Sequence, residues 1–362
     1  MDLNIIEICF HIGKNFAVTP STLDNYEASF WQSTYNLMML LFFTGGSGIS
    51  LYYRAPAYIQ YNPIQLVLWV FTDVVRYVHN VYTLVVVIII QRAKWFNLIL
   101  NLRESFYGMD QESESLQKSY YLTFILAQAS FCVVISFMFY ICYVSYNLYE
   151  SILLYLTEFL QFYTQFFFIT FYCVVVKMLR ARYQKTLSSR VFSSCAANLN
   201  ELRILKKKIF TLKQTVDIFN DIFGGTVLLN ILFTSSKSIV YLDRILKTQD
   251  ASAQFSSAFN IFLHVIQVAV LVLMWSMVLQ VTFLCDAILE DFDQALRDLY
   301  KSKLVQTDLK WCKREFQKLV QLFLDNRPKF TAARFFTINR STILHLINSI
   351  ITFLIVCIQF KN

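Results

Sequence analysis

The chain has 362 residues, of which 56% are hydrophobic, 17% aromatic and only 15% charged, and its formal net charge is +8. This composition leaves too little polar surface to cover a water-soluble globule of this size, so the sequence predicts an all-α polytopic membrane protein. No aromatic residues are interleaved with the basic cluster Lys206–Lys208 as base stacking would require, and a nucleic-acid partner is therefore not expected.

Residues 1–29 are predicted to form a cytoplasmic amino-terminal segment. They contain Asp2 and Glu7 but no basic stretch that leads into an apolar core, so a cleaved secretory signal is not expected. Asp2 also stands where myristoylation would need a glycine. The first predicted span then serves as the insertion signal.

Seven long stretches with few charges follow, and each is long enough to cross a bilayer with some tilt. The predicted transmembrane helices are Phe30–Tyr53, Pro63–Ile90, Tyr120–Tyr146, Ile152–Val176, Ile218–Leu242, Phe255–Leu284 and Ile338–Phe360. The first four occupy the region 30–184, the next two the region 218–285, and the last lies in 338–362 with the tail. The fourth helix is expected to continue through Tyr183 and the sixth through Tyr300.

The distribution of Lys and Arg predicts the orientation, because basic residues of short loops stay on the cytoplasmic side. With the amino terminus inside and the carboxy terminus outside, 26 of the 32 basic residues are cytoplasmic and four, including Arg54, are extracellular. The reverse topology would expose those 26 residues. This orientation is opposite to that of a G-protein-coupled receptor, and it accounts for the positive net charge.

Two cytoplasmic regions between the spans, 185–217 and 286–337, are expected to be helical. Apolar residues recur at helical spacing in Leu199–Val216 and in Leu309–Leu324. The second helix is predicted to present the anchor residues Leu309, Cys312, Phe316, Leu319 and Phe323 to a partner. These helices either form a bundle beneath the membrane or lie on membrane lipid of the inner leaflet, where Lys206–Lys208 could bind anionic headgroups.

Catalytic and metal chemistry have little support in the sequence. The eight cysteines fall in spans or on the reducing cytoplasmic side, so no disulfides are expected, and no C-x-x-C pair or histidine cluster suggests a metal site. The cluster Gly45–Gly48 lacks the lysine of a phosphate-binding loop, and neither H-E-x-x-H nor G-x-S-x-G occurs. The chain is therefore predicted not to be an enzyme and to need no cofactor.

Polar side chains within the spans are costly, so each is a candidate site residue. The candidates for a ligand pocket in the outer halves of spans two to six are Trp69, Asp73, Arg76, Tyr140, Tyr143, Tyr155, Gln161, Asn230, Lys237, Asn260, His264 and Gln267. Asp73 and Arg76 are three residues apart and can neutralise each other on one helix face, and Glu158 is a possible partner for Lys237. Such a cavity suits a small neutral or weakly polar organic ligand. The alternative is that these side chains only hydrogen-bond neighbouring helices.

The last predicted span ends in Thr352-Phe353, five hydrophobic residues and Gln359-Phe360. This ending resembles the carboxy-terminal signature of insect gustatory receptors, which is threonine-tyrosine, five hydrophobic residues and glutamine-phenylalanine. Ala332–Ser341 also resembles the block that precedes the seventh span in that family. The inverted orientation is a further point of similarity.

The resemblance implies a ligand-gated cation channel assembled as a homotetramer or as a heterotetramer with related receptors. The last span of each subunit would line one pore, with Val356, Gln359 and Phe360 at its narrow point and Thr352 packing the helix. A small organic tastant would open the pore to cations at the plasma membrane of a sensory neuron, and the cytoplasmic bundle would be the place where the subunits meet. Sugar receptors tend to carry glutamate where this chain has Leu354, which favours a bitter, deterrent or divergent receptor and leaves the fructose-type branch open.

Two alternatives stay open at this point. An insect odorant receptor channel has the same architecture, although the Gln-Phe ending and the short chain favour the gustatory side. A secondary transporter would place Asp73, Arg76, Glu158 and Lys237 on a substrate path at the membrane midplane. That class also predicts internal repeats, which the sequence does not show.

Overall fold

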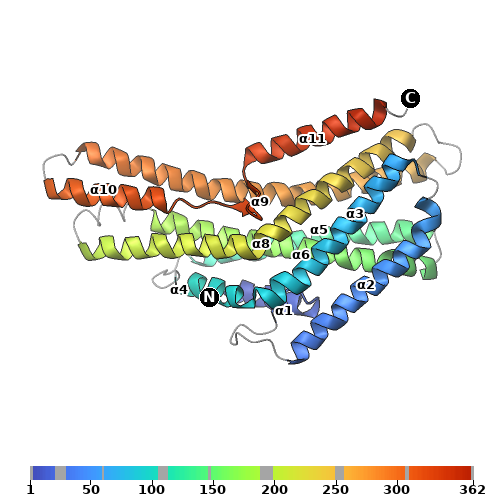
Figure 1. Ribbon diagram of the computed structural model, residues 1–362, viewed down its shortest axis with the longest axis horizontal. Coiled ribbons are helices and arrows are strands. Elements are labelled where there is room, and N and C mark those ends of the chain that lie inside the picture. The colour runs from blue at the N-terminus through green and yellow to red at the C-terminus, as the bar shows by residue number, and fades with distance from the viewer. Residues whose placement is uncertain are drawn as a thin grey trace.

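A computed structural model describes residues 3–20, 30–58, 61–104, 113–145, 148–187, 199–248, 257–305 and 310–359 of the chain, and most of these are helical. The helices are α1 (Leu3–Asn15), α2 (Phe30–Tyr58), α3 (Pro63–Tyr82), the π-helix η1 (Thr83–Ile90), α4 (Arg92–Glu104), α5 (Ser113–Ser145), α6 (Leu148–Thr186), α8 (Leu199–Thr248), α9 (Ser257–Val305), α10 (Lys310–Asp325) and α11 (Arg340–Gln359). A short hairpin of β1 (Thr331–Ala332) and β2 (Phe336–Thr337) precedes α11. Figure 1 shows the long helices running side by side along the longest axis.

Five helical segments in the described part of the chain are long and apolar enough to cross a membrane. They are Pro63–Ile90, Lys118–Ser145, Leu148–Thr186, Arg203–Ile245 and Ile261–Lys301, and they correspond to predicted spans two to six. The first and seventh predicted spans coincide with α2 and α11, of which α11 contains a shorter apolar helix, Arg340–Val356. Seven crossings and the sidedness of the termini therefore stay predictions.

Helix α6 is the central element of the bundle. It packs against α2, α3, α5, α8 and α9, and every residue from Gln165 to Val176 is buried. A helix that is apolar on all sides is stable when either other helices or lipid surround it, and here other helices do. The aromatic residues of this stretch, such as Phe167, Phe171 and Tyr172, are nearly inaccessible and form the middle of the core.

The lengths of the helices agree in part with the sequence predictions. Helices α6 and α9 continue past their spans, through Thr186 and Val305, as expected. In contrast, the predicted cytoplasmic helix Leu199–Val216 and the fifth span are one uninterrupted helix of 50 residues, α8. No proline separates the two segments, so nothing in the sequence breaks the helix there.

A π-helix, η1, ends the second predicted span where the sequence indicated a regular α-helix. Trp95 of α4 is fully buried and donates a hydrogen bond from Nε1 to the Val87 carbonyl oxygen of η1 at 3.1 Å. Its ring stacks on Phe171 at 5.6 Å and meets the edge of Phe10 from α1 at 5.4 Å. The amino-terminal helix is thus part of the core, although residues 1–29 showed no predicted element.

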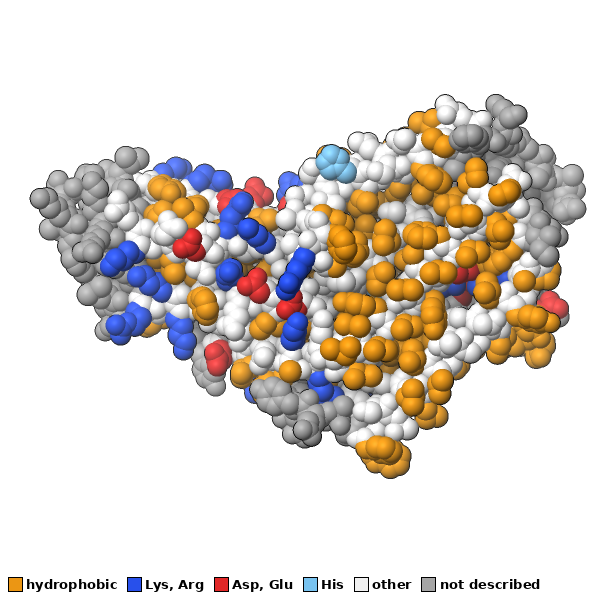
Figure 2. Space-filling model, in the orientation of Figure 1, with side chains coloured by type: hydrophobic (Ala, Val, Ile, Leu, Met, Phe, Trp, Pro, Cys, Tyr) orange, Lys and Arg blue, Asp and Glu red, His pale blue; other side chains and the backbone are white. Residues whose placement is uncertain are grey.

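The surface divides into a charged part and an apolar part (Figure 2). On the face shown, Lys and Arg side chains gather on the left, near α10 and the start of α8, whereas hydrophobic side chains cover the right, over α2, α3 and α11. Large apolar side chains of these three helices are exposed, such as Trp31 of α2 at 80%, Val67 of α3 at 66% and Leu344 of α11 at 64%. An apolar surface of this extent needs lipid or another subunit to cover it.

The β-hairpin before α11 is held against the middle of α8. Asn220 of α8 donates a hydrogen bond from Nδ2 to the Lys329 carbonyl oxygen at 2.6 Å and accepts one at Oδ1 from the Thr331 amide at 3.1 Å. Asp221 forms ion pairs with Arg334 at 2.9 Å and with Lys94 of α4 at 2.8 Å. The start of α11 is therefore fixed to the helix that also reaches the candidate site.

Candidate functional site

Five charged side chains from four helices lie together inside the bundle. They are Arg54 of α2, Asp73 and Arg76 of α3, Glu158 of α6 and Lys237 of α8, and their side chains are between 5% and 13% exposed. Charges so deep in an apolar bundle are stable only when they are paired and hydrogen-bonded. Both pairings suggested by the sequence, Asp73 with Arg76 and Lys237 with Glu158, are present.

Each carboxylate of the cluster is shared by the two arginines. Asp73 lies 2.8 Å from Arg76 Nη2 and 3.2 Å from Arg54 Nη2, and it accepts a hydrogen bond from the Tyr58 hydroxyl at 2.6 Å. Glu158 accepts hydrogen bonds from Arg76 Nη1 and from Arg54 Nη1, the latter at 3.3 Å. The planar guanidinium groups suit such bridging, because each presents several donors in a fixed geometry.

Lys237 is the third cation of the cluster, and its ammonium group is held less closely. Its Nζ lies 3.7 Å from Glu158 Oε1, and it lies 5.0 Å from the ring centroids of Trp69 and of Tyr241. These are distances of an ion pair without a hydrogen bond and of two cation–π contacts. The side chain is thus placed between a carboxylate and two aromatic faces.

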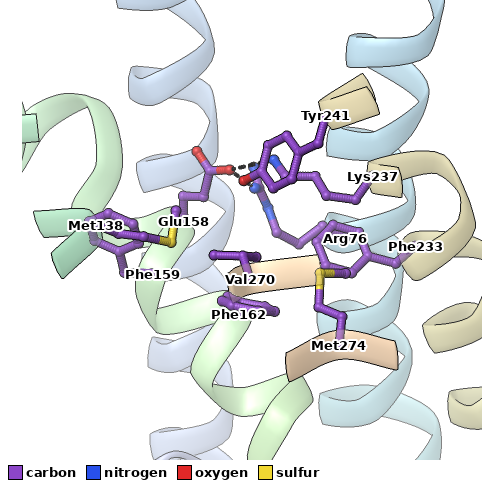
Figure 3. A pocket seen from close by; sticks show the side chains of 10 residues that line it. All are labelled: Arg76, Met138, Glu158, Phe159, Phe162, Phe233, Lys237, Tyr241, Val270 and Met274. Atoms are coloured by element: carbon purple, nitrogen blue, oxygen red, sulfur yellow. Dashed lines mark hydrogen bonds and ion pairs between the residues drawn. The ribbon is translucent and has the colours of Figure 1, made fainter. Parts of the chain in front are cut away.

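The charged cluster borders a cavity of about 20 Å³ that lies among α3, α5, α6, α8 and α9. Its lining residues are Arg76, Met138, Glu158, Phe159, Phe162, Phe233, Lys237, Tyr241, Val270 and Met274. Figure 3 shows Glu158 and Lys237 together with the ring of Tyr241 at one end, and Phe162, Val270 and Met274 at the other. About 10–15 Å³ is enough for one water molecule, so the cavity must enlarge before an organic ligand can enter.

Four of the predicted pocket residues, Trp69, Asp73, Arg76 and Lys237, belong to this site or contact it directly. Gln161 supports it from α6, because its Oε1 accepts a hydrogen bond from Arg76 Nε at 3.2 Å and its Nε2 donates to Ser47 Oγ at 2.8 Å.

The other predicted pocket residues that the structure describes do not line the cavity. Tyr140 and Tyr143 are 55% and 53% exposed on α5, whereas Tyr155 contacts the cavity residue Phe159, with their stacked ring centroids 6.1 Å apart. His264 and Gln267 contact each other along α9 at 3.5 Å. Asn230 is buried in α8, and the side chain of Asn260 lies outside the described residues.

Sequence reasoning missed most of the cavity wall, because it searched the spans for polar residues only. Phe162, Phe233 and Met274 carry no signal that separates them from ordinary core residues. The sequence placed Arg54 just beyond the first span, among the extracellular basic residues, and gave no sign that its side chain is buried. Arg54 lies within α2 and completes the buried cluster.

The predicted pore residues lie at the end of α11. The Thr352 hydroxyl donates a hydrogen bond to the Asn348 carbonyl oxygen at 2.9 Å, Val356 is 38% exposed and Gln359 is exposed. Phe360 lies outside the described residues. Beside α11, an apolar groove of about 330 Å³ separates it from α8 and α9, and Trp275, Ile347 and Leu354 are among its lining residues.

The predicted anchor residues lie in and next to α10. Leu319 and Phe323 are buried, and the ring of Phe323 packs on Phe292 of α9 at 5.4 Å. Leu309 and the side chains of Cys312 and Phe316 lie outside the described residues. At least the second half of α10 therefore packs on its own subunit.

Comparison with protein families matches residues 6–362 to the family model described as 7tm chemosensory receptor. The chain belongs to this chemosensory receptor family. No match is found among curated proteins. The match covers nearly the whole chain, so the receptor is a multi-pass membrane protein of a family that is not enzymatic.

Two solved structures have the same fold as this receptor. One is the insect olfactory receptor OR5 from Machilis hrabei in complex with eugenol, with a TM-score of 0.71, 14% sequence identity, and coverage of 99% of this chain and 100% of that one. The other is a second structure of the insect olfactory receptor OR5 from Machilis hrabei, with a TM-score of 0.65, 14% identity, and coverage of 99% of this chain and 98% of that one. At this identity the likeness establishes the fold.

Proposed function

We propose that this chemosensory receptor is a ligand-gated cation channel of the gustatory type, in which a small organic compound binds in the cavity among α3, α5, α6, α8 and α9. The observation that carries the proposal is a cavity with one charged end and apolar walls, inside a chain of the chemosensory receptor family. The ending Thr352-Phe353 to Gln359-Phe360 favours the gustatory type over the odorant type. Leu354 stands where sugar receptors tend to carry glutamate, which favours a bitter, deterrent or divergent receptor over a sugar receptor.

The size of the cavity and the helices that form it explain how a ligand would open the channel. The cavity of about 20 Å³ holds no organic ligand, so a ligand binds the enlarged form and shifts the population toward it. Helices α8 and α9 supply five of its lining residues and also contact α11. Enlargement of the cavity therefore displaces α8 and α9, on which α11 packs. The groove between α11 and these two helices provides room for α11 to move.

Four copies would place α11 around a common axis, with Val356, Gln359 and Phe360 bordering the narrow point for permeating cations. Homotetramers and heterotetramers with related receptors both satisfy this arrangement. The solvent-exposed apolar face of α11, which includes Leu344 and Ile351, is the surface that other subunits would cover.

The test uses whole-cell current recording from cells that express the chain, with sugars, bitter compounds, amino acids and volatile odorants as separate panels. Met274→Ala removes part of the cavity wall and enlarges the cavity. The control, Val272→Ala, shortens a side chain of the same helix that is 61% exposed. We expect Met274→Ala to shift the half-effective concentration about five-fold or more, because a buried side-chain contact contributes roughly 1–3 kcal/mol. Val272→Ala is expected to leave the half-effective concentration unchanged. The same half-effective concentration in both variants would show that the ligand binds elsewhere.

A further inference from the structure

The charged cluster beside the cavity has one more cation than anion. Arg54, Arg76 and Lys237 carry three positive charges, and Asp73 and Glu158 carry two negative ones. The nearby Asp243 lies two turns further along α8, accepts a hydrogen bond from Gln65 Nε2 at 2.6 Å and does not line the cavity. Surplus charge in an apolar bundle is costly until a counter-charge arrives.

The surplus is concentrated on Lys237. Both carboxylates already accept hydrogen bonds or ion pairs from the two arginines, whereas Lys237 Nζ stands 3.7 Å from Glu158 Oε1. An ammonium group has three N–H donors. Within the described part of the chain, its contacts are this ion pair and the two ring faces of Trp69 and Tyr241, none of which is a hydrogen-bond acceptor at short range.

The position of Lys237 makes these donors available to a ligand. Its side chain is 8% exposed, and it lines the cavity together with Arg76 at the charged end (Figure 3). Phe162, Val270 and Met274 close the opposite end with apolar groups. A ligand that enters this space meets a cationic head site at one end and an apolar site at the other.

We propose that the cavity binds a small organic anion, a carboxylate with an apolar body, and that Lys237 is its counter-ion. The carboxylate neutralises the surplus charge of the cluster and accepts hydrogen bonds from the ammonium group, while the body packs on the aromatic wall. This replaces the neutral or weakly polar ligand expected from the sequence. The inference rests on the proposed function only in placing the ligand in this cavity.

The experiment compares matched compounds on the purified full-length receptor in detergent micelles. Benzoate, phenylacetate and 3-phenylpropanoate are each paired with the primary amide of the same skeleton, near neutral pH, where a carboxylic acid of pKa about 4 is ionised. Binding is read from the concentration dependence of the thermal unfolding midpoint. We expect the best carboxylate to bind at least about ten-fold more tightly than its amide, the effect of a charge-assisted hydrogen bond in a water-poor site.

Three variants assign the preference to Lys237. Lys237→Gln is expected to abolish it, Lys237→Arg to retain it, and Arg244→Gln, on the same helix but exposed and outside the cavity wall, to leave it unchanged. Amides that bind as tightly as the carboxylates, carboxylates that do not bind, or a preference that survives Lys237→Gln would each overturn the inference.

Current recordings with the same compounds separate this inference from the proposed function. Carboxylates that bind with the expected preference but evoke no current would support the anion site and contradict the channel. Currents evoked by neutral compounds alone, with sensitivity to Met274→Ala, would support the channel and contradict the anion site.

Discussion

At the scale of single residues, the receptor keeps five charges inside an apolar bundle, and their individual contributions to stability should differ in a way that charge balance predicts. Glu158 is the carboxylate that contacts all three cations. Within the cluster, Lys237 has the longest ion-pair distance, 3.7 Å. Removing the first increases the surplus charge, whereas removing the second abolishes it.

Glu158→Gln is therefore expected to destabilise the receptor by about 3–5 kcal/mol, the usual cost of leaving buried charges without their partner. Lys237→Met leaves two arginines with two carboxylates and is expected to cost no more than about 1 kcal/mol, since it loses cation–π contacts and a long ion pair. Thermal unfolding midpoints in detergent and the amount of receptor at the cell surface measure the difference. Equal losses in the two variants would show that charge balance does not govern this cluster.

The sequence revealed part of this cluster, and the reason for its limits is physical. The spacing of Asp73 and Arg76 fixes them on one helix face, so their ion pair followed from helical geometry alone. Glu158 and Lys237 were paired by depth and charge, which sequence can estimate. Arg54 was missed because charge at the end of a span is read as a loop residue, although its long side chain reaches back into the bundle.

At the scale of the elements, the long helices were predictable and their irregular ends were not. Apolar length gave spans two to six and the extensions of α6 and α9. The apolar residues of η1 did not predict a π-helix; Trp95 of α4, eight residues beyond Val87 in the sequence, donates a hydrogen bond from Nε1 to the Val87 carbonyl oxygen. The β-hairpin depends on contacts with α8 more than 100 residues away in the sequence. Local patterns carry no information on such distant partners.

The close approach of the hairpin to α8 leads to a prediction at Gly224. A Cβ atom at this position would lie 2.8 Å from the Ala333 backbone nitrogen and 3.0 Å from the Thr331 carbonyl oxygen. Since backbone must move to accommodate it, Gly224→Ala is expected to cost about 1–3 kcal/mol and to weaken the coupling between ligand and current. The thermal midpoint and the maximal current per surface receptor report the two effects.

Gly45→Ala in α2 is the matched control, because nothing lies within 4 Å of its added methyl group. Alanine is the better helix former by about 1 kcal/mol, so this variant should be as stable as the wild type or slightly more stable. A Gly224→Ala receptor that matched this control in both measurements would mean that the hairpin is free to move away from α8.

At the scale of the whole molecule, one chain contains both a buried cavity with a charged end and an apolar helix that its own bundle does not cover. In the described part of the chain, helix α11 packs mainly against α8 and α9, and many of its apolar side chains are exposed. The composition predicted a membrane protein, and the carboxy-terminal motif predicted the family. Neither indicates how many copies assemble, because that depends on surfaces whose partners are absent from a single chain.

The last prediction joins the pore to the orientation of the chain. If α11 lines a fourfold pore, Gln359 is repeated around the axis at its outer mouth, so Gln359→Glu changes the charge there four times. Cation selectivity should change, and the effective ligand concentration should not, because the cavity is built from other helices. Reversal potentials in solutions of different cations measure the cation selectivity, and dose–response curves measure the effective ligand concentration.

Accessibility then separates a pore residue from an interfacial cap. A Gln359→Cys receptor should be modified by a membrane-impermeant thiol reagent applied from outside, with a block of the current that depends on ligand. Ser349→Cys lies about 15 Å deeper on the same helix, as expected from a rise of about 1.5 Å per residue, and it should react more slowly. Reversal potentials that stay constant in Gln359→Glu, or thiol modification only from the cytoplasmic side, would rule out α11 as the outer pore of an inverted receptor.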